Sequence, residues 1–268
     1  MTGPRKNVPI REWQDGDRVQ GFAFLAAKER RQDRSGNDYL HLELRDATGQ
    51  IPAKAWSGSP ALDGEFEANE FIAFEGSVQS YRDRLQLVVR KCRRAREEDR
   101  EYGFDEGTLV PSTREDLDDL WDRMNDLLDR EIRHPALVSL VEVTLSSHGE
   151  ALKEHPAAKS IHHAYRGGLL EHVVSMLELA VAVCDHYREI NRELVLLGVL
   201  YHDLGKIQEL GAMPANDYTA AGRFVGHVVQ GRDLLRDACR AVGDVPEDLQ
   251  LHLEHLVLSH QGRKEWGS

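Results

Sequence analysis

The stretch GVLYHDLGK (residues 198–206) decides how the second half of the chain is interpreted. Its first residues are apolar and suit a buried helix, and the adjacent pair His202 and Asp203 ends that apolar run. Burying an imidazole and a carboxylate is costly unless both find partners. We therefore favour a shared metal ion over a purely structural role for this pair.

Histidine is frequent in this chain, with 13 among 268 residues, and all except His41 lie after residue 130. His172, His227 and His260 share the apolar, helix-like setting of His202, and imidazoles from separate helices can converge on one ion. For His255 a supporting role and a structural role both stay open. A lone histidine is more often a hydrogen-bonded core or surface residue, and we keep that interpretation for His41, His134, His148, His155, His186 and His252.

The rest of the second half favours helices. Apolar residues between Leu117 and Leu128 recur at helical spacing, which predicts a helix that follows a capping box at residues 112–115 and ends before Pro135. Further helices are predicted over residues 169–187, 193–204, 219–242 and 246–259. The polar, aperiodic residues 97–111 predict a linker before this region.

The first half favours strands. The segment YLHLEL (residues 39–44) alternates with period two between the turn signals SGN (35–37) and ATG (47–49). Other strands are predicted from Val19 and over residues 51–56, 71–78 and 85–89. Five short strands fit a small closed barrel, because closure leaves no strand edge exposed. We expect a multidomain β + α protein: a barrel domain over residues 1–96, a linker over 97–115 and a helical domain over 116–268.

Charge divides the chain in the same place. The formal net charge is −12. Residues 1–96 carry 17 Lys and Arg against 14 Asp and Glu, a net of +3, whereas residues 97–268 carry 17 against 32, a net of −15. A mildly basic module can follow a phosphate backbone, and an acidic module benefits from bound cations.

Composition excludes several classes of protein. No run of 18 uncharged apolar residues occurs, and no apolar segment follows the N-terminal MTGPRK, so we expect neither a membrane span nor a signal peptide. Cys92, Cys184 and Cys239 form no C-x-x-C pair, which disfavours a disulfide scaffold and a cysteine zinc site. A reducing cytoplasmic location is the simplest expectation.

Several sequence blocks resemble one family in the correct order. They are HHAYRGGLLEH (162–172), HDLGK (202–206), YT (218–219) with GH (226–227), and LSHQG (258–262) with EWGS (265–268). Together they closely resemble the HD domain of YhaM-type 3′→5′ exoribonucleases, within the HD-domain metal-dependent phosphohydrolase superfamily. Because that family also has an N-terminal OB-fold, the resemblance implies an OB-fold barrel followed by an all-α HD domain. It covers nearly the whole chain.

The resemblance implies a metal site. His172, His202 and Asp203 would hold one divalent ion, and Asp203 would bridge to a second ion held by His227 and His260. Family members depend on a divalent metal, often Mn²⁺, although imidazole and carboxylate ligands do not select among manganese, iron, zinc and cobalt. The expected catalytic residues are Asp203, which would orient or activate the attacking water, and Lys206. One helical turn beyond His202, Lys206 would contact a phosphate oxygen, with a solvated helix-end lysine as its alternative.

Two departures from the family pattern stand out. The family has a second histidine after the Ser-His pair, whereas this chain has Gln261, and HD domains end their ligand set with an aspartate on a later helix. We therefore expect residues 116–268 to lack the C-terminal end of the HD domain. Asp233 and Asp237 are internal candidates to replace that aspartate, but nothing in the sequence recommends them.

The barrel is expected to hold the nucleic acid. OB-folds bind single strands by stacking bases on aromatic side chains and by following phosphates with basic residues. For each aromatic candidate, packing in the barrel core is the alternative, and we assign Phe22, Phe71 and Phe74 to such packing. The predicted nucleic-acid-binding residues are Phe24, Tyr39, Trp56, Tyr81, Arg82 and Arg84, with Lys54 nearby, and Arg166 in the helical half, where an exposed arginine is the alternative.

Three interpretations of function follow. The first is a metal-dependent 3′→5′ exoribonuclease that hydrolyses single-stranded RNA, with DNA as a further candidate substrate, to nucleoside monophosphates. The second is an HD phosphohydrolase that acts on nucleotides, although a small substrate needs no strand-binding barrel. The third is a nucleic-acid-binding protein with an inactive or truncated HD scaffold, supported by Gln261 and the missing aspartate.

Overall fold

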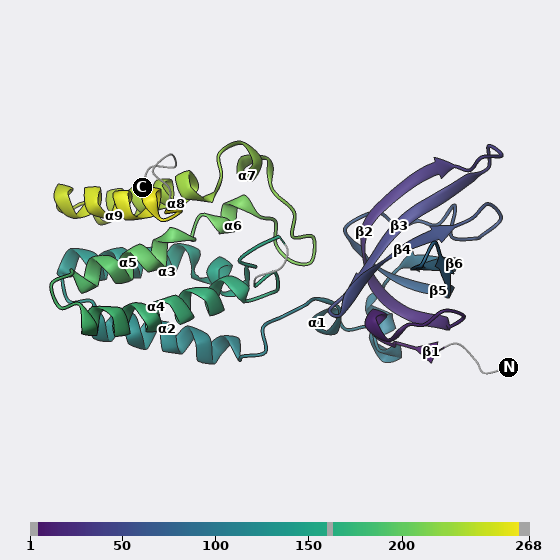
Figure 1. Cartoon of the computed structure of the whole chain (residues 1–268), viewed down its shortest axis with the longest axis horizontal. Helices are drawn as coiled ribbons and strands as arrows, with labels where there is room; N and C mark the ends of the chain where they lie inside the picture. The colour runs from purple at the N-terminus through teal and green to yellow at the C-terminus, as the bar shows by residue number, and fades with distance from the viewer. Residues whose placement is uncertain (1–4, 160–162, 263–268) are drawn as a thin grey trace. The chain divides into compact units, whose positions relative to one another are not determined.

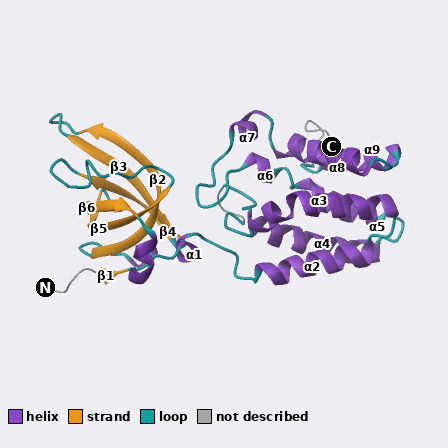
Figure 2. Ribbon diagram, turned by 180° about the vertical axis from the view of Figure 1, so that it is seen from behind, coloured by secondary structure: helices purple, strands orange, loops and turns teal. Residues whose placement is uncertain are grey.

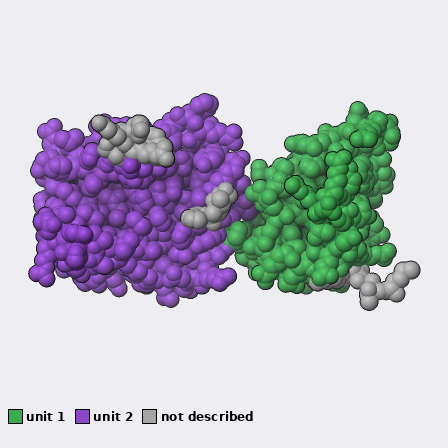
Figure 3. Space-filling model, in the orientation of Figure 1, with its two compact units in different colours: residues 1–111 green, residues 112–268 purple. Residues whose placement is uncertain are grey.

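The structure is a computed structural model that describes residues 5–159 and 163–262. The chain divides into two compact units, residues 1–111 and residues 112–268 (Figures 1 and 3). The first unit is built from strands and the second from helices (Figure 2). The division falls inside the predicted linker.

Unit 1 is a closed five-stranded barrel with one short extra strand. The barrel strands are β2 (Arg18–Gln32), β3 (Asp38–Asp46), β4 (Gly49–Ala55), β5 (Glu70–Tyr81) and β6 (Arg84–Arg94), and β1 (Arg5–Lys6) pairs with β2. The order runs β2-β3-β4-β6-β5, and β5 returns to pair with β2. Within the barrel all pairs are antiparallel except β4 with β6, and the outer pair of β1 with β2 is parallel. This Greek-key circuit is that of an OB-fold, so the expected fold class of the first half is confirmed.

Alternation along the strands fills the barrel. Leu40, Leu42 and Leu44 of the YLHLEL segment all point inward and are buried. They meet Ile72 of β5 and Leu87 of β6, which are also fully buried. Because the side-chain period of a strand is two, the intervening residues of these strands face outward.

Residues 97–111 are ordered against the barrel and differ from the predicted aperiodic linker. They form η2 (Glu97–Tyr102) and α1 (Glu106–Leu109), and a further short helix, η1 (Ile10–Glu12), precedes β2 in the chain. Between η2 and α1, Phe104 packs on Phe22 and Phe71, with ring centroids 5.2 and 5.8 Å apart. Asp99 forms a bidentate ion pair with Arg93 of β6. The segment therefore belongs to unit 1, because it packs on the outward-facing rings of Phe22 and Phe71.

Unit 2 is all-α in its described residues. Its helices are α2 (Leu117–Glu131), α3 (Pro135–Glu154), α4 (Gly168–His186), α5 (Arg192–His202), α6 (Lys206–Glu209), α7 (Ala220–Phe224), α8 (His227–Val242) and α9 (Glu247–Ser259). One hydrophobic core joins α2, α3, α4, α5, α8 and α9. Within the described chain, every helix is too short or too polar to cross a lipid bilayer.

Two helix boundaries differ from the predictions. Helix α2 begins after Asp116, whose carboxylate accepts hydrogen bonds from the Asp118 and Asp119 amides, so the predicted capping box at residues 112–115 is wrong. The helix predicted over residues 219–242 is broken into α7 and α8. Gly226 lies between them with φ +79°, a left-handed conformation that ends α7 and frees His227 to begin α8.

Candidate metal centre and nucleic-acid interface

Helix ends bring five predicted ligands to one place in unit 2. His202 ends α5 and Asp203 follows it directly, His227 begins α8, His260 follows α9, and His172 lies in the second turn of α4. The turn after Asp203 must pass very close to α8, since a Cβ on Gly205 would stand 2.0 Å from the His227 carbonyl oxygen. Glycine at this position is what lets α5 and α8 share the site.

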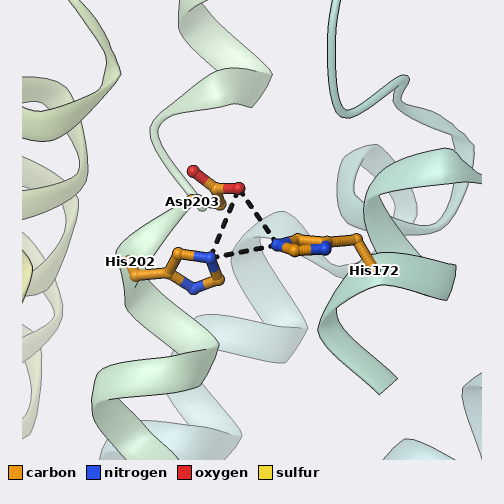
Figure 4. A group of neighbouring side chains, drawn as sticks. All are labelled: His172, His202 and Asp203. Atoms are coloured by element: carbon orange, nitrogen blue, oxygen red, sulfur yellow. Dashed lines mark hydrogen bonds and ion pairs between the residues drawn. The ribbon is translucent and has the colours of Figure 1, made fainter. Parts of the chain in front are cut away.

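His172, His202 and Asp203 form the first group (Figure 4). The Nε2 atoms of the two imidazoles are 3.2 Å apart. They lie 3.4 Å (His172) and 3.3 Å (His202) from Asp203 Oδ2. The carboxylate side chain is only 7% exposed. Three potential donor atoms therefore form a nearly equilateral triangle of one buried carboxylate oxygen and two partly buried imidazole nitrogens.

His227, His260 and Asp203 form a second, wider group on the other carboxylate oxygen. The Nε2 atoms of His227 and His260 lie 3.6 and 4.0 Å from Asp203 Oδ1. Gln261 takes part here, because its amide nitrogen donates to both imidazole Nε2 atoms, at 3.2 and 3.1 Å. Asp203 is thus shared between two sets of histidines.

In His202, His227 and His260, hydrogen bonds of the Nδ1 atom leave the Nε2 atom facing the site. Nδ1 of His202 donates to the Val199 carbonyl at 2.6 Å, and Nδ1 of His260 donates to the Val257 carbonyl at 2.7 Å. Nδ1 of His227 donates to Glu209 Oε1 at 3.0 Å. A neutral imidazole with its proton on Nδ1 keeps a lone pair on Nε2. This second layer of hydrogen bonds is the arrangement that metal-binding histidines use.

The donor set fits a divalent cation. Ligand atoms about 2.1 Å from one ion stand roughly 3.0–3.4 Å apart in octahedral or tetrahedral geometry. The separations in the first group lie within that range, while those in the second group are larger. Neighbouring lone pairs and a carboxylate repel one another unless a positive charge lies among them.

Lys206 supplies one positive charge at this point. Its ammonium lies 2.7 Å from Asp203 Oδ2, the oxygen that faces His172 and His202. Burial raises the pKa of Asp203, but the neighbouring imidazoles of His172 and His202 and the charge of Lys206 outweigh burial and hold that pKa well below its usual range. The pKa of His260 is lowered, chiefly by burial. The carboxylate is thus ionised and available as a ligand at neutral pH.

Most of the predicted barrel residues meet on one face of unit 1. The rings of Tyr39 and Trp56 lie 5.0 Å apart, at the start of β3 and just after β4. The Lys54 ammonium lies 5.7, 5.2 and 5.4 Å from the ring centroids of Tyr39, Trp56 and Tyr81. Trp56 and Tyr81 are 38% and 53% exposed. This is the aromatic face: Tyr39, Lys54, Trp56 and Tyr81.

Two arginines flank the aromatic face. Arg82 lies over the Tyr81 ring at 5.4 Å, and Arg84 pairs with Tyr81 across the β5–β6 hairpin and is exposed. OB-folds bind oligonucleotides on their second and third strands and on the loop between the fourth and fifth strands. These elements correspond here to β3, β4 and the β5–β6 hairpin.

Comparison with protein families identifies the helical unit. Residues 169–267 match the HD domain family model. Unit 2 carries an HD domain. The match includes all five residues of the histidine–aspartate cluster, and HD domains bind divalent metals. A second model, described as "Putative helicase", matches residues 113–191 and overlaps the start of the HD domain.

Solved structures of OB domains resemble unit 1. The second OB-fold domain of replication protein A from Methanococcus maripaludis is 19% identical, covering 33% of this chain and 92% of that chain, with a TM-score of 0.28. An OB domain from Methanosarcina mazei is 20% identical, covering 36% and 88%, with a TM-score of 0.30. The OB-fold assignment of the barrel rests on its strand pairing, and the chain combines such a barrel with an HD domain.

The HD domain contains a residue that the sequence analysis missed. Glu209, at the end of α6, accepts hydrogen bonds from both the backbone amide and Nδ1 of His227, at 3.1 and 3.0 Å. Its carboxylate therefore stabilises the first turn of α8 and orients the imidazole. The only sequence signal was its place one turn after Lys206, on the helix that continues the HDLGK block.

A second network lies beside His172. Tyr165 and Thr113 both donate to Glu171 Oε2, at 2.9 and 2.5 Å. The Tyr165 hydroxyl also lies 2.8 Å from His163 Nδ1, and the His163 ring centroid is 5.7 Å from that of His172. His163 and Tyr165 of the HHAYRGGLLEH block thus pack against the HD-domain site, and the first residue of the block, His162, lies outside the described residues.

Two other predicted residues are engaged elsewhere or buried. The Arg166 guanidinium forms a bidentate ion pair with Glu154 and lowers the pKa of that carboxyl, so Arg166 holds the loop before α4 to α3. Phe24 is only 2% exposed and its ring packs against Phe71 with a centroid distance of 5.6 Å. The prediction that Phe24 stacks on a base is wrong, because its ring is buried against Phe71, whose own ring Phe104 contacts.

The remaining candidates do not join the cluster. His255 is exposed, Asp233 pairs with the partly buried Arg232, and Asp237 pairs with the exposed Arg240. The sequence EWGS (265–268), which contributed to the resemblance, lies outside the described residues. Among the described residues, the acidic member of the site is Asp203.

Proposed function

We propose that the chain is a metal-dependent 3′→5′ exoribonuclease that removes nucleoside 5′-monophosphates from single-stranded RNA. The observation that carries the proposal is the convergence of four imidazole Nε2 atoms on the two oxygens of Asp203. A barrel with an exposed aromatic and basic face supports a strand rather than a free nucleotide as substrate. Three cysteines without disulfides support a cytoplasmic location.

The residues have separate roles in this reaction. His172, His202 and Asp203 would hold one divalent ion, with His227 and His260 completing a second position beside Asp203. A bound ion of this kind, with Mn²⁺ as the proposed metal, lowers the pKa of water and neutralises phosphoryl charge. Asp203 would accept a hydrogen bond from the attacking water, and the Lys206 ammonium would contact a non-bridging phosphate oxygen. Water adds to phosphorus, the bond to the O3′ of the preceding nucleotide breaks, and that O3′ takes a proton.

A second function is favoured by one specific observation. Lys206 already lies on Asp203 Oδ2, and the Gln261 amide already satisfies His227 and His260. The Lys206 charge offsets the Asp203 carboxylate, and the Gln261 amide gives the two imidazoles a hydrogen-bond partner. No ion is needed for either contact, as expected of a nucleic-acid-binding protein that does not hydrolyse its ligand. Catalysis and binding therefore need to be measured together.

The deciding experiment uses the full chain with Mn²⁺ and single-stranded RNA labelled at its 5′ end. We expect stepwise shortening that EDTA stops and that His202→Ala and Asp203→Ala each abolish. His252→Ala is the matched control, because His252 is exposed on α9 and outside the cluster. Binding without shortening would favour the second function, and hydrolysis of free nucleotides but not RNA would favour a nucleotide phosphohydrolase.

A further inference from the structure

Phe224 is unusually exposed beside the HD-domain site. It is the last residue of α7 and is 89% exposed, more than any other large hydrophobic residue in the described chain. It stands three residues before His227, so the two Cα atoms are at most about 11 Å apart. That distance is comparable to the span of one or two nucleotides.

The short helix that carries Phe224 is held in place. A Cβ on Gly222 would lie 2.1 Å from the Glu209 carbonyl oxygen, so α7 packs directly on the end of α6. That same carbonyl accepts a hydrogen bond from the Thr219 amide at 2.9 Å, while the Glu209 side chain binds His227. Glu209 therefore connects α7 to the first residue of α8, and Phe224 is presented at a defined place relative to the site.

The surroundings of Phe224 combine aromatic and basic side chains. Tyr218 is 43% exposed, and the Lys159 ammonium lies 5.7 Å from its ring centroid. Arg223, next to Phe224, is 61% exposed, and both cations share the single carboxylate of Asp217. Among these exposed side chains the two cations outnumber the one carboxylate, which favours a polyanion over another acidic surface.

We propose that Phe224 stacks on a nucleobase near the 3′ end of the strand and thereby positions the terminal phosphodiester at Asp203. The proposal rests on the proposed exoribonuclease function and adds a base contact within the HD domain itself. Base–aromatic stacking tolerates any base, because every base has a π face. The stacking contact would therefore form with an RNA 3′ end of any base sequence.

The test has two readouts on the full chain. In the first, an RNA with 2-aminopurine as its 3′ nucleotide is bound in EDTA, where cleavage cannot occur, and its fluorescence reports stacking. We expect wild-type protein to change this fluorescence and Phe224→Ala to remove the change. In the second, kcat/KM for RNA with Mn²⁺ falls about tenfold or more in Phe224→Ala, in line with the loss of one stacked base.

Matched variants distinguish the loss of stacking from a general loss of folding or binding. Phe224→Trp keeps an aromatic ring and should retain both signals. Leu251→Ala removes another apolar side chain, 66% exposed on α9, and should change neither. An abasic 3′ nucleotide should lower wild-type cleavage as much as Phe224→Ala does, and the two changes should not add.

The outcomes distinguish the two proposals. If wild-type protein does not cleave but Phe224→Ala loses the fluorescence change, the stacking contact stands and the exoribonuclease proposal fails. If wild-type protein cleaves and Phe224→Ala matches it in both readouts, the stacking proposal fails alone. Equal effects of Phe224→Ala and Phe224→Trp would also overturn it, because the ring itself would then not matter.

Discussion

At the residue scale, Asp203 joins the two halves of the site. Its Oδ2 faces His172, His202 and Lys206, and its Oδ1 faces His227 and His260. A carboxylate can do this because its two oxygens each accept several partners. The histidines are in turn held by carbonyl oxygens and by Glu209, so the site depends on residues that would not touch an ion themselves.

Glu209 provides a residue-scale prediction. Glu209→Gln keeps the size of the side chain but weakens the hold on His227 Nδ1, so we expect affinity for Mn²⁺ to fall about 10–100-fold. Isothermal titration calorimetry with Mn²⁺ measures this directly. Glu189→Gln, at an exposed position after α4, is the control and should bind as wild type. Unchanged affinity in Glu209→Gln would show that Glu209 does not support the ion.

At the scale of elements, the close crossing at Gly205 positions the start of α8. A Cβ at this position would stand 2.0 Å from the His227 carbonyl oxygen and 2.6 Å from the Gly231 amide nitrogen. Both contacts are with backbone, which cannot move aside as a flexible side chain can. The α5–α6 turn and α8 must therefore separate if any side chain is added.

Gly205→Ala tests this crossing. We expect a loss of about 1–3 kcal/mol in the free energy of unfolding, since overpacking forces the backbone to shift. Urea unfolding followed by circular dichroism gives the value. Gly211→Ala is the control, because its Cβ would meet only ordinary contacts, the nearest at 3.5 Å. Equal stability of the two variants would contradict the close approach.

His155 gives the second prediction at this scale. It caps the end of α3, is buried, and its Nε2 donates to the Leu210 carbonyl at 3.0 Å. Burial lowers its pKa, more than the hydrogen bond to the carbonyl raises it. The unfolded chain therefore binds a proton more readily than the folded chain. The contribution of His155 to stability is complete above its unfolded pKa of about 6.5 and falls as the pH drops below it.

The pH dependence is measured as urea unfolding between pH 5 and pH 7.5. His155→Gln can still donate to the Leu210 carbonyl but does not titrate. We expect the free energy of unfolding to fall less for the variant than for wild type as the pH drops. The difference in free energy of unfolding between the two proteins therefore narrows at low pH. His252→Gln, at an exposed position on α9, should keep the wild-type slope. If the free energy of unfolding of His155→Gln fell with pH as steeply as that of wild type, burial of His155 would not affect its protonation.

At the scale of the whole molecule, the proposed roles in binding and in chemistry fall on different units. Unit 1 carries the aromatic face and a small positive charge, and unit 2 carries the buried donor cluster and most of the negative charge. Damage to the aromatic face should therefore reduce affinity for a strand while leaving the HD-domain site intact.

Trp56→Ala combined with Tyr81→Ala tests this division. Each stacked base is worth about 1–3 kcal/mol, so we expect RNA affinity to fall at least tenfold. Fluorescence anisotropy with labelled oligouridine measures it, and Mn²⁺ binding by calorimetry should be unchanged. Tyr102→Ala, 72% exposed on η2, is the control from the same unit. Loss of Mn²⁺ binding in the double variant would contradict independent roles.

Many of the strands, helices and candidate ligands could be predicted because each depends on a local pattern in the sequence. Period-two alternation in YLHLEL identified β3, and apolar helical segments identified the helices that carry His172 and His202. The histidines could be selected because imidazoles in apolar helices need partners. The change in charge after residue 96 separated a basic from an acidic part, but the boundary between the units lies later, after residue 111.

Other features depended on contacts between segments far apart in the sequence. Phe24 and Trp56 are both aromatic residues in or beside strands, yet Phe24 is buried against Phe71, which Phe104 also contacts, and Trp56 is exposed. Local periodicity tells which face of a strand a side chain occupies, but not what later packs on that face. The sequence by itself determined the strands, the helices and the candidate ligands. Only the tertiary structure decided which of those side chains meet, since hydrogen bonds such as Glu209 to His227 form only when separate helices come together.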